Sequence, residues 1–535
     1  MTPAIDKKSI FVLEDGTNLM FTFILVSSLF LLWGFCNGMI DVMDKHFQEE
    51  LSLTKSQSAW VQFAHYLGYF LMSMPAGWMA SKLGYKGGIV AGLLIVAVGG
   101  FWFIPATHIT AFWAFLLGVC IIASGLTFLE TVANPYTTVL GDPRYAATRI
   151  NLAQSCNGIG WILGPIAGGA FFYSRNAQGV STGSQTLYIP YVAVAITVIV
   201  IALVFRFSNI PDIKTKDDYH LEEAVAGESI AENNPATRTA VAQGEDRPIN
   251  RALVYALLLF NALVLAGSCG MIVWVILGTL RVSDATMSMI LWTLGVVSIA
   301  IAAVALLPVA KKITNHSIWS HPHFSSAVLA QFFYVAAQAG IFSFFINYMT
   351  SEVPNLPASW ASGFLSGWFE AGKGGLLHIS DKGASNLASF GSFCFLAGRF
   401  SGAGILRKFS AHKVLGLYGV LNVCTCGLIF LKLGWFSVVC VFLSYFFMSI
   451  MFPTIFALGI FGLGARAKKA SSFIVMAIMG GAILPKLMGH VADQYDMSRG
   501  FIVPMFCFAF VALYGFNWSR FSHAESLQGV KLSGH

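Results

Sequence analysis

Long uninterrupted runs of apolar residues constrain this chain more than any other feature of its sequence. Three of them are "LMFTFILVSSLFLLWGF" (19–35), "IVAGLLIVAVGGFWFI" (89–104) and "PYVAVAITVIVIALVF" (190–205). Each is at or near the length that a helix needs to cross the hydrocarbon core of a bilayer. Only 11% of the 535 residues are charged, whereas soluble domains carry about 25%. The chain is therefore predicted to be an all-α polytopic membrane protein.

The remaining composition argues against several other kinds of site. Nine cysteines is an odd number, and most of them lie inside apolar blocks, which indicates neither a disulfide framework nor a zinc site. The net charge of +7 carries no information about nucleic acid, because in a membrane protein the distribution of charge over the loops matters more than its sum. "GKGG" (372–375) lacks the spacing of a phosphate-binding loop. We expect no cofactor, no bound metal and no nucleic-acid partner.

The apolar blocks are arranged as six spans, a polar linker, two spans and six more spans, about 14 in all by the twenty-residue criterion. The predicted spans are about 19–40, 57–80, 87–106, 110–137, 147–173 and 187–207, then 251–280 and 285–310, then 323–349, 384–406, 412–432, 435–463, 468–490 and 499–519. The linker is acidic and almost free of aromatic residues, so it is predicted to be solvated. The predicted units are a six-helix lobe (1–207), the linker (208–250), an inserted helix pair (251–322) and a second six-helix lobe (323–535). Within the second lobe, a long outer loop is expected at 351–383, partly ordered.

Lysine and arginine residues accumulate in alternate turns between the predicted spans. These turns all belong to one face of the membrane and contain Lys82, Lys86, Arg144, Arg149, Arg407, Lys408, Lys413, Arg466, Lys468 and Lys469. Because short cytoplasmic loops are enriched in Lys and Arg, this face is predicted to be cytoplasmic. Both termini and the acidic linker are then expected in the cytoplasm.

An internal repeat relates the two six-helix sets. "ANPYTTVLG" (133–141) followed by "RINLAQSCNGIGWILGP" (149–165) has a counterpart in "MFPTIFALG" (451–459) followed by "ASSFIVMAIMGGAILP" (470–485). Each copy places a proline near the end of one span and a glycine-rich run in the next. Duplicated halves are typical of secondary transporters, whose substrate site lies near the membrane midplane between the repeats.

Several of these segments resemble a known family. "PAGWMASKLGYK" (75–86) resembles the basic loop signature of the major facilitator superfamily, with Ser81 where that signature usually has an aspartate. "LETVANPYTTVLG", "RINLAQSCNGIG" and "GRFSGAGILRKFSAHKVL" resemble the fucose:proton symporter family of sugar permeases, and the similarity covers nearly all of both six-helix sets. The resemblance implies the major facilitator fold and proton-driven monosaccharide import across a bacterial inner membrane. We expect a monomer whose partners are the sugar and membrane lipid.

The resemblance also implies a central ionisable pair, which falls on Glu130 and Asp41 in this sequence. The glucose/galactose branch of the family typically has glutamine in place of the glutamate, so Glu130 favours the fucose-like branch. Gly38 and Ile40 replace polar residues that fucose permeases usually carry just before the aspartate. The identity of the sugar is therefore left open between fucose and other hexoses.

Glu130 is also unusual on physical grounds alone. A charged carboxylate at the centre of a membrane helix costs about 2.5–3.5 kcal/mol on insertion scales, so it must be protonated, paired or facing a wet cavity. It is either an acid that only bonds a neighbouring helix or the group that binds and releases the coupled proton. Asp41 lies near Asp44 and Lys45, so it is either a solvated helix end or the second coupling carboxylate. Which of the two carries the proton is left open.

Amide and hydroxyl side chains on shared helix faces are candidates for sugar binding. A site built on paired hydroxyl groups discriminates well, because an unpaired buried polar group is costly. The candidates, grouped by helix face, are Gln154 with Asn157; Gln331 with Tyr334 and Gln338; and Asn37, one turn before Asp41. The alternative is that each set only joins neighbouring helices, at about 0.6 kcal/mol per contact.

Arg399 is an intramembrane cation with no acid near it in sequence, and we expect it to have a gating or structural role. Sodium is the alternative coupling ion, because a carboxylate with nearby amide oxygens can also bind a cation. A membrane enzyme would require a nucleophile–base pair or a metal site, and neither pattern is present, so no enzymatic activity is expected. A drug exporter of the same superfamily is a further alternative, although the amide-rich helices argue against it.

Overall fold

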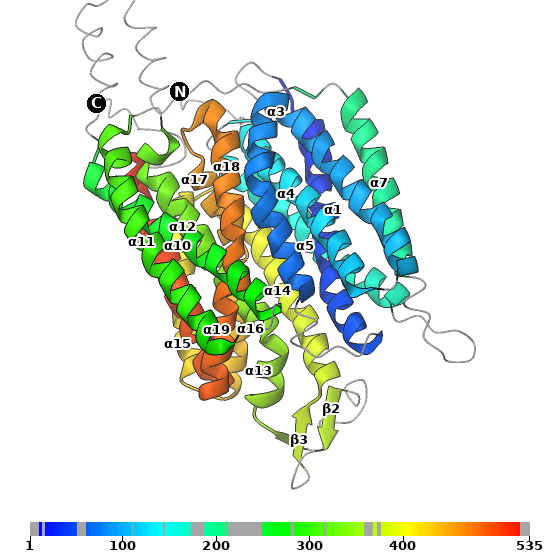
Figure 1. Cartoon of the computed structure of the whole chain (residues 1–535). Coiled ribbons are helices and arrows are strands. Elements are labelled where there is room, and N and C mark those ends of the chain that lie inside the picture. Colours follow the sequence, from blue (N-terminus) through cyan, green and yellow to red (C-terminus); the bar gives the residue numbers. More distant parts are fainter. Residues whose placement is uncertain are drawn as a thin grey trace, which may run out of the picture.

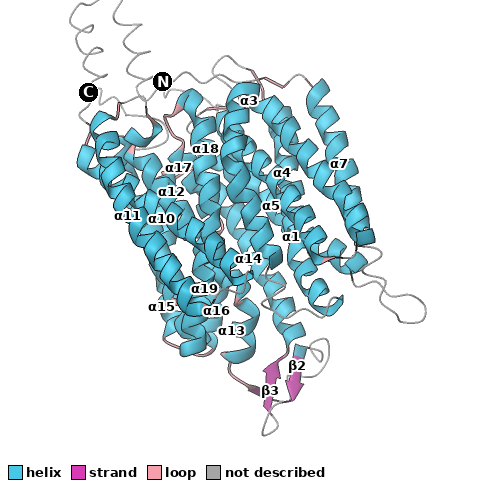
Figure 2. Cartoon of the chain, viewed as in Figure 1, coloured by secondary structure: helices cyan, strands magenta, loops and turns pink. Residues whose placement is uncertain are grey.

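The computed structural model describes residues 10–12, 17–50, 60–109, 111–142, 145–172, 187–208, 210–211, 249–279, 283–314, 317–357, 368–371 and 376–524. Nearly all of these residues are helical, and the helices run side by side through one bundle (Figures 1 and 2). Eleven of the described helices are long and apolar enough to cross a membrane. Most of the predicted linker (208–250) lies outside the described residues.

In the first half of the chain, the described residues form five long helices. They are α1 (Met20–Glu50), α3 (Trp60–Ile109), α4 (Phe112–Val139), α5 (Ala146–Phe172) and α7 (Tyr188–Phe207). The helix α3 has 50 residues and is kinked at Gly84, where φ is 74°. Positive φ is a conformation that glycine adopts without steric cost. The two predicted spans at 57–80 and 87–106 therefore meet at this glycine, and α3 crosses the bundle twice.

The second half contains shorter and more broken helices. They are α12 (Pro322–Ser343), α13 (Phe345–Ser351), α14 (Asp381–Leu406), α15 (Ala411–Phe430), α16 (Trp435–Met448), α17 (Met451–Gly459), α18 (Ala467–Met476), α19 (Gly480–Gln494), α20 (Met497–Gly500) and α21 (Ile502–Ser522). Short 3₁₀ turns accompany them: η2 (Ile318–Ser320), η6 (Gly464–Arg466) and η7 (Ala477–Met479).

The predicted span at 435–463 was expected to be one helix, but it is divided into α16 and α17. The division falls at Ser449 and Ile450. Pro453 has no backbone N–H, so the carbonyl of Ser449 lacks the partner that an unbroken helix would supply. The span at 468–490 is similarly divided, into α18, η7 and α19.

The inserted pair consists of α10 (Arg251–Thr279) and α11 (Asp284–Lys312), which pack against each other beside α12 (Figure 1). The Asn261 amide donates a hydrogen bond to the carbonyl oxygen of Ser325 at 3.1 Å. Near the other end of α10, the Lys486 ammonium of α19 lies 3.0 Å from the centre of the Trp274 ring. The pair is therefore attached to the second half, while most of α11 is exposed on the outside of the bundle.

A small antiparallel sheet occupies part of the predicted outer loop at 351–383. Its strands are β1 (Leu356–Pro357), β2 (Phe369–Ala371) and β3 (Leu376–Ile379), in the order β1-β3-β2. Leu356 pairs with Leu377, and Phe369 pairs with Ile379. The sheet extends from the end of the bundle opposite the chain termini (Figure 2).

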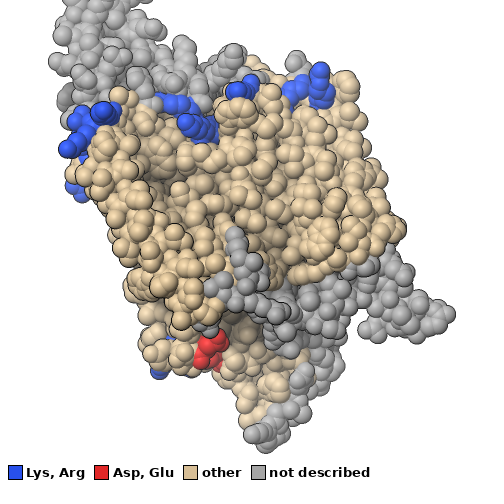
Figure 3. Space-filling view, in the orientation of Figure 1, with Lys and Arg blue, Asp and Glu red and all other residues tan. Residues whose placement is uncertain are grey.

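Positive side chains gather at the end of the bundle where both termini lie (Figures 1 and 3). We call this end the basic face; the described lysines and arginines at the helix ends and turns on this side are Lys82, Lys86, Arg206, Arg251, Lys311, Lys312, Arg407, Lys408, Lys413, Arg466, Lys468, Lys469 and Arg520, with Arg149 buried beneath them. At the opposite end, Lys432 is paired with Glu352 at 3.2 Å and with Asp496 at 3.0 Å. The two ends therefore differ strongly in charge.

Close packing between α1 and α5 holds one wall of the first half. A Cβ atom added to Gly160 of α5 would lie 2.3 Å from the backbone oxygen of Leu31 in α1. A Cβ added to Gly34 of α1 would lie 2.0 Å from the backbone oxygen of Asn157. Gly160 and Gly164 form a GxxxG pair, the pattern that lets membrane helices approach backbone to backbone. This approach fixes the position of α5, which carries Gln154 and Asn157.

Replacing Gly160 with alanine should separate α1 from α5 and destabilise the protein by about 1–3 kcal/mol, the usual cost of overpacking. Thermal unfolding of the purified protein in detergent would measure this as a lower melting temperature. Gly267→Ala in α10 is the matched control, because no atom lies within 4 Å of its added Cβ. A melting temperature of Gly160→Ala equal to that of the control would contradict the packing described above.

Candidate functional site

Polar side chains from both halves of the chain meet inside the bundle. Glu130 and Asn134 lie one turn apart on α4 and are 2% and 0% exposed. Gln154 and Asn157 lie on α5, and Arg399 lies on α14; all three are buried. Because buried polar groups are costly unless they are paired, a group of polar side chains inside apolar helices indicates a functional site.

The guanidinium of Arg399 joins the two halves. Its Nη1 donates to the Asn157 side-chain oxygen at 3.1 Å and to the Gln154 side-chain oxygen at 3.3 Å. The same nitrogen donates to the backbone oxygen of Gln154. Its Nε donates to the carbonyl oxygen of Ser449 at 3.1 Å. This carbonyl is the one left without a helical partner by Pro453, so the helix break and the arginine satisfy each other.

A hydrogen bond carries this network on to α4. The side-chain nitrogen of Gln154 donates to the Asn134 side-chain oxygen at 3.0 Å. The Gln154 amide therefore has Arg399 on its oxygen and Asn134 on its nitrogen. Asn134 is one turn from Glu130, so the hydrogen bonds that start at the cation of the second half end beside the carboxyl group of the first.

The Glu130 carboxyl group has polar neighbours but makes no ordinary hydrogen bond with them. It interacts electrostatically with Arg399 and lies near Tyr69 and Asn134, yet neither carboxyl oxygen has a hydrogen-bond partner in this conformation. Tyr69 in turn accepts a hydrogen bond from the indole of Trp33. The carboxyl group borders a cavity of about 10 Å³, which is at the lower limit for one water molecule and too small for a sugar.

Eight buried polar atoms of Asn134 and of the predicted site residues have no hydrogen-bond partner in this conformation. Such atoms are Oδ1 of Asn37, Nδ2 of Asn134, Nδ2 of Asn157, both amide atoms of Gln331, the hydroxyl of Tyr334 and both carboxyl oxygens of Glu130. They include donors and acceptors from four helices, α1, α4, α5 and α12. Since nearly all buried polar groups in proteins are paired, these atoms are suited to a ligand that offers several hydroxyl groups.

Aromatic rings line the boundary between the halves. The Phe452 ring of α17 lies 6.5 Å from the Trp33 ring and 6.3 Å from the Tyr334 ring, measured between centroids. Trp33 belongs to α1 and Tyr334 to α12, so Phe452 bridges two helices from opposite halves. Rings of this kind offer flat apolar surfaces beside the buried polar atoms that have no hydrogen-bond partner.

The structure brings together most of the predicted site residues. Glu130, Asn37, Gln154, Asn157, Gln331, Tyr334 and Arg399 are all buried in this region. Gln338, one further turn along α12, is only half-buried. The side chain of Asp41 lies outside the described residues, although its backbone belongs to α1.

Four residues of this region were not predicted from the sequence: Trp33, Tyr69, Asn134 and Phe452. A signal existed for Asn134, since it is one turn from Glu130 within "LETVANP". The internal repeat could also have found Phe452, which occupies the position in "MFPTIFALG" that Asn134 occupies in "ANPYTTVLG". Within the described part of the chain, no group of three or more His, Cys, Asp and Glu side chains could hold a metal ion.

The two halves are in direct contact between the site and the basic face. The Lys468 ammonium lies 4.1 Å from the centre of the Tyr85 ring. The Asn151 amide donates to the hydroxyl of Thr454 at 3.1 Å. These contacts join α3 to α18 and α5 to α17, so the site is closed toward the basic face in this conformation.

Relatives of known function resemble the chain over almost its whole length. The Major Facilitator Superfamily profile matches residues 19–485. The L-fucose-proton symporter of Escherichia coli strain K12 is 31% identical over 493 residues, which cover 92% of each chain. The glucose/galactose transporter of Brucella abortus is 26% identical, again over 92% of each chain.

Solved structures agree with these sequence relatives. The crystal structure of FucP, a major facilitator transporter in the outward conformation, has a TM-score of 0.64 and 28% identity, and the match covers 94% of this chain and 99% of that chain. The proton:xylose symporter XylE has a TM-score of 0.58 at 11% identity, which shows a shared fold alone. The predicted major facilitator fold is confirmed. The chain belongs to the major facilitator superfamily and to its fucose:proton symporter family, and it is a multi-pass sugar transporter rather than an enzyme.

Proposed function

We propose that this protein imports a monosaccharide together with a proton by alternating access. The observation that carries the proposal is the Glu130 carboxyl group, which is buried, has no hydrogen-bond partner in this conformation and interacts electrostatically with Arg399 of the other half. A site at the boundary of two repeats can open to one side and then to the other as the halves rock against each other. The contacts next to the basic face support a conformation closed on that side.

Proton coupling is proposed for Glu130 because its charge has two alternative ways of being compensated. An isolated charge inside a membrane protein is strongly disfavoured, so a carboxyl group there is either protonated or paired. Glu130 can hold a proton, or it can ionise and be balanced by Arg399, with which it interacts electrostatically. Exchange between these states would change the electrostatic attraction between Glu130 and Arg399. It would thereby affect the hydrogen bonds that Arg399 donates to the amides of Gln154 and Asn157. Proton binding and sugar binding would then use the same network.

Asp41 is proposed as the second coupling carboxylate, since the family resemblance gives it that role. Comparison of proton-driven sugar accumulation by Glu130→Gln and by Asp41→Asn would show which of the two carboxyl groups carries the proton. Sodium is the alternative coupling ion, because a carboxyl group beside amide oxygens also suits a small cation.

The proposed substrate is a hexose of the fucose or glucose/galactose class. The names of the relatives support both sugars, and the glutamate at position 130 favours the fucose-like branch. Asn37, Gln154, Asn157, Gln331 and Tyr334 supply donors and acceptors for sugar hydroxyls, and Gln338 extends the same face of α12. A buried polar set of this kind rejects analogues that lack the matching hydroxyl.

We further propose a monomer in a bacterial inner membrane, with the basic face and both termini in the cytoplasm. The concentration of lysine and arginine at one end of the bundle supports the proposed orientation (Figure 3), whereas the monomer and the inner membrane are proposed from the family resemblance. Retention of positive loops on the cytoplasmic side accounts for this asymmetry. In this orientation, the conformation described above is closed toward the cytoplasm.

Glu130→Gln should abolish sugar accumulation driven by an acidic exterior, because glutamine keeps the size and polarity of the side chain but cannot exchange a proton. Exchange of labelled sugar against unlabelled sugar, which needs no net proton movement, should remain. Uptake by reconstituted vesicles in sodium-free buffer measures both activities. Asp493→Asn, an exposed position in α19, is the control and should behave like the wild type. Full accumulation of sugar by Glu130→Gln would exclude Glu130 from proton coupling. If uptake by the wild type strictly required sodium, the coupling ion would be sodium and not the proton.

Arg399→Lys should lower both the melting temperature in detergent and the further stabilisation caused by added sugar. A lysine ammonium cannot reach Ser449 on one side and the Gln154 and Asn157 amides on the other, as the forked guanidinium does. Each hydrogen bond to a charged group is worth about 1.5–3 kcal/mol. Arg407→Lys, at the exposed end of the same helix, is the matched control. Equal behaviour of the two variants would show that the network has no part in binding.

A further inference from the structure

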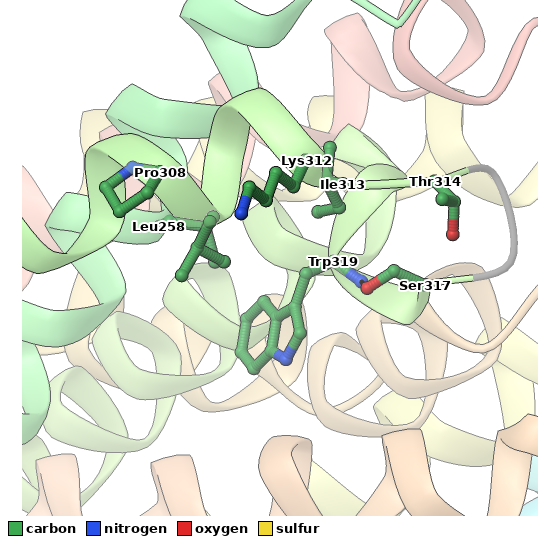
Figure 4. Close-up of a pocket in the computed structure, with 8 residues that line it drawn as sticks. Leu258, Pro308, Lys312, Ile313, Thr314, Ser317 and Trp319 are labelled. Atoms are coloured by element: carbon green, nitrogen blue, oxygen red, sulfur yellow. Dashed lines mark hydrogen bonds between the residues drawn. The ribbon is translucent and has the colours of Figure 1, made fainter.

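The inserted helix pair carries a feature that sugar transport does not use. A hollow of about 440 Å³ lies where the basic-face ends of α10 and α11 meet η2 (Figure 4). Its apolar wall includes Leu258, Val309 and Ile313, and its polar part includes Lys312 and Ser317. The hollow is open rather than enclosed, so a ligand there would remain partly exposed at the outside of the bundle.

The lysine and the hydroxyl groups occupy different parts of the hollow. Figure 4 shows Lys312 extending along the apolar wall toward Leu258, while the hydroxyl groups of Thr314 and Ser317 lie on the other side. The Trp319 ring forms the floor and packs edge-on against Phe473 at 4.8 Å, which anchors it to the second half. A ligand that fits would therefore have an apolar part against Leu258, an anionic group beside it at Lys312, and a polar part toward Thr314 and Ser317.

The depth of the hollow in the membrane follows from helix length. The helix α11 has 29 residues, which corresponds to about 44 Å at about 1.5 Å per residue. A bilayer including its head groups is about 40–45 Å thick. Lys312 is the last residue of α11, so it lies at the level of the head groups, and the wall formed by Leu258 and Val309 lies next to the acyl chains.

The charged side chains around the hollow are positive, which favours a negatively charged ligand. Arg251 begins α10, and Lys311 and Lys312 end α11, so three cations gather at these helix ends. Among the described residues from 249 to 321, Asp284 is the single acidic residue, and it begins α11 at the opposite end. Basic pockets between membrane helices on the positive side are suited to anionic lipid head groups.

We propose that this hollow binds one anionic phospholipid, with its phosphate at the Lys312 ammonium, the polar part of its head group toward Thr314 and Ser317, and the first part of an acyl chain against Leu258 and Val309. The lipid fills the space between the inserted pair and η2. The pair is then joined to the second half through lipid as well as through the Asn261 and Trp274 contacts. The proposal does not depend on the sugar or on the coupling ion.

Quenching of Trp319 fluorescence by lipids with brominated acyl chains tests the site in vesicles. The full-length protein is reconstituted in phosphatidylcholine with increasing fractions of brominated phosphatidylglycerol or, separately, brominated phosphatidylcholine. The Trp319 signal is the difference between wild type and Trp319→Phe. We expect half-maximal quenching at a several-fold lower fraction of the brominated anionic lipid than of the brominated zwitterionic lipid.

Lys312→Gln should remove this preference, while Lys408→Gln, an exposed lysine elsewhere on the basic face, should retain it. Equal quenching by the two lipids would overturn the proposal in favour of ordinary boundary lipid. Relief of the quenching by inorganic phosphate would assign the polar part of the site to free phosphate instead. Native mass spectrometry provides a measurement that needs no tryptophan variant: wild type should retain one more phosphatidylglycerol than Lys312→Gln, and equal retention would again contradict the site.

Discussion

The buried guanidinium of Arg399 is the interaction on which the organisation of the site depends. Its guanidinium donates hydrogen bonds to α5 of the first half and to the carbonyl of Ser449 in the second half. These bonds can persist together only while the two halves stay close at this point. The carbonyl is available because Pro453 breaks the hydrogen-bond ladder of its helix. Removing a buried charge from such partners is costly, so the arginine stabilises the halves in the contacting state while Glu130 offers it an alternative partner.

The two copies of the internal repeat share their proline and glycine positions but differ in the polar side chains that they carry. Glu130 and Asn134 in the first half correspond to Met448 and Phe452 in the second, when the prolines at 135 and 453 are aligned. The first half therefore supplies the acid and most of the amides, and the second supplies a cation and an aromatic surface. A polar wall facing a mixed wall suits a sugar, which has both hydroxyl edges and apolar faces. It also places opposite charges on parts that move relative to each other.

Much of the fold could be predicted because each span leaves a direct mark in the sequence, namely an apolar block bounded by charged turns. Glu130, Gln154, Asn157 and Arg399 were predicted for the same reason, since a polar residue is conspicuous within an apolar helix. Trp33, Tyr69 and Phe452 were not predicted, because aromatic residues are common in such helices and only packing shows which of them face the site. The division between α16 and α17 was not predicted, although Pro453 is visible in the sequence, because Pro135 at the equivalent position lies inside the unbroken helix α4. The partner of the freed Ser449 carbonyl is Arg399, 50 residues away.

The central claim is that sugar and proton cross together through the Glu130 network. Recording the pH of a weakly buffered, sodium-free medium around reconstituted vesicles tests it most directly. Addition of the transported sugar should make the external medium more alkaline, in proportion to the sugar taken up, as protons enter with it. Uptake of the sugar with no change in external pH would contradict the account.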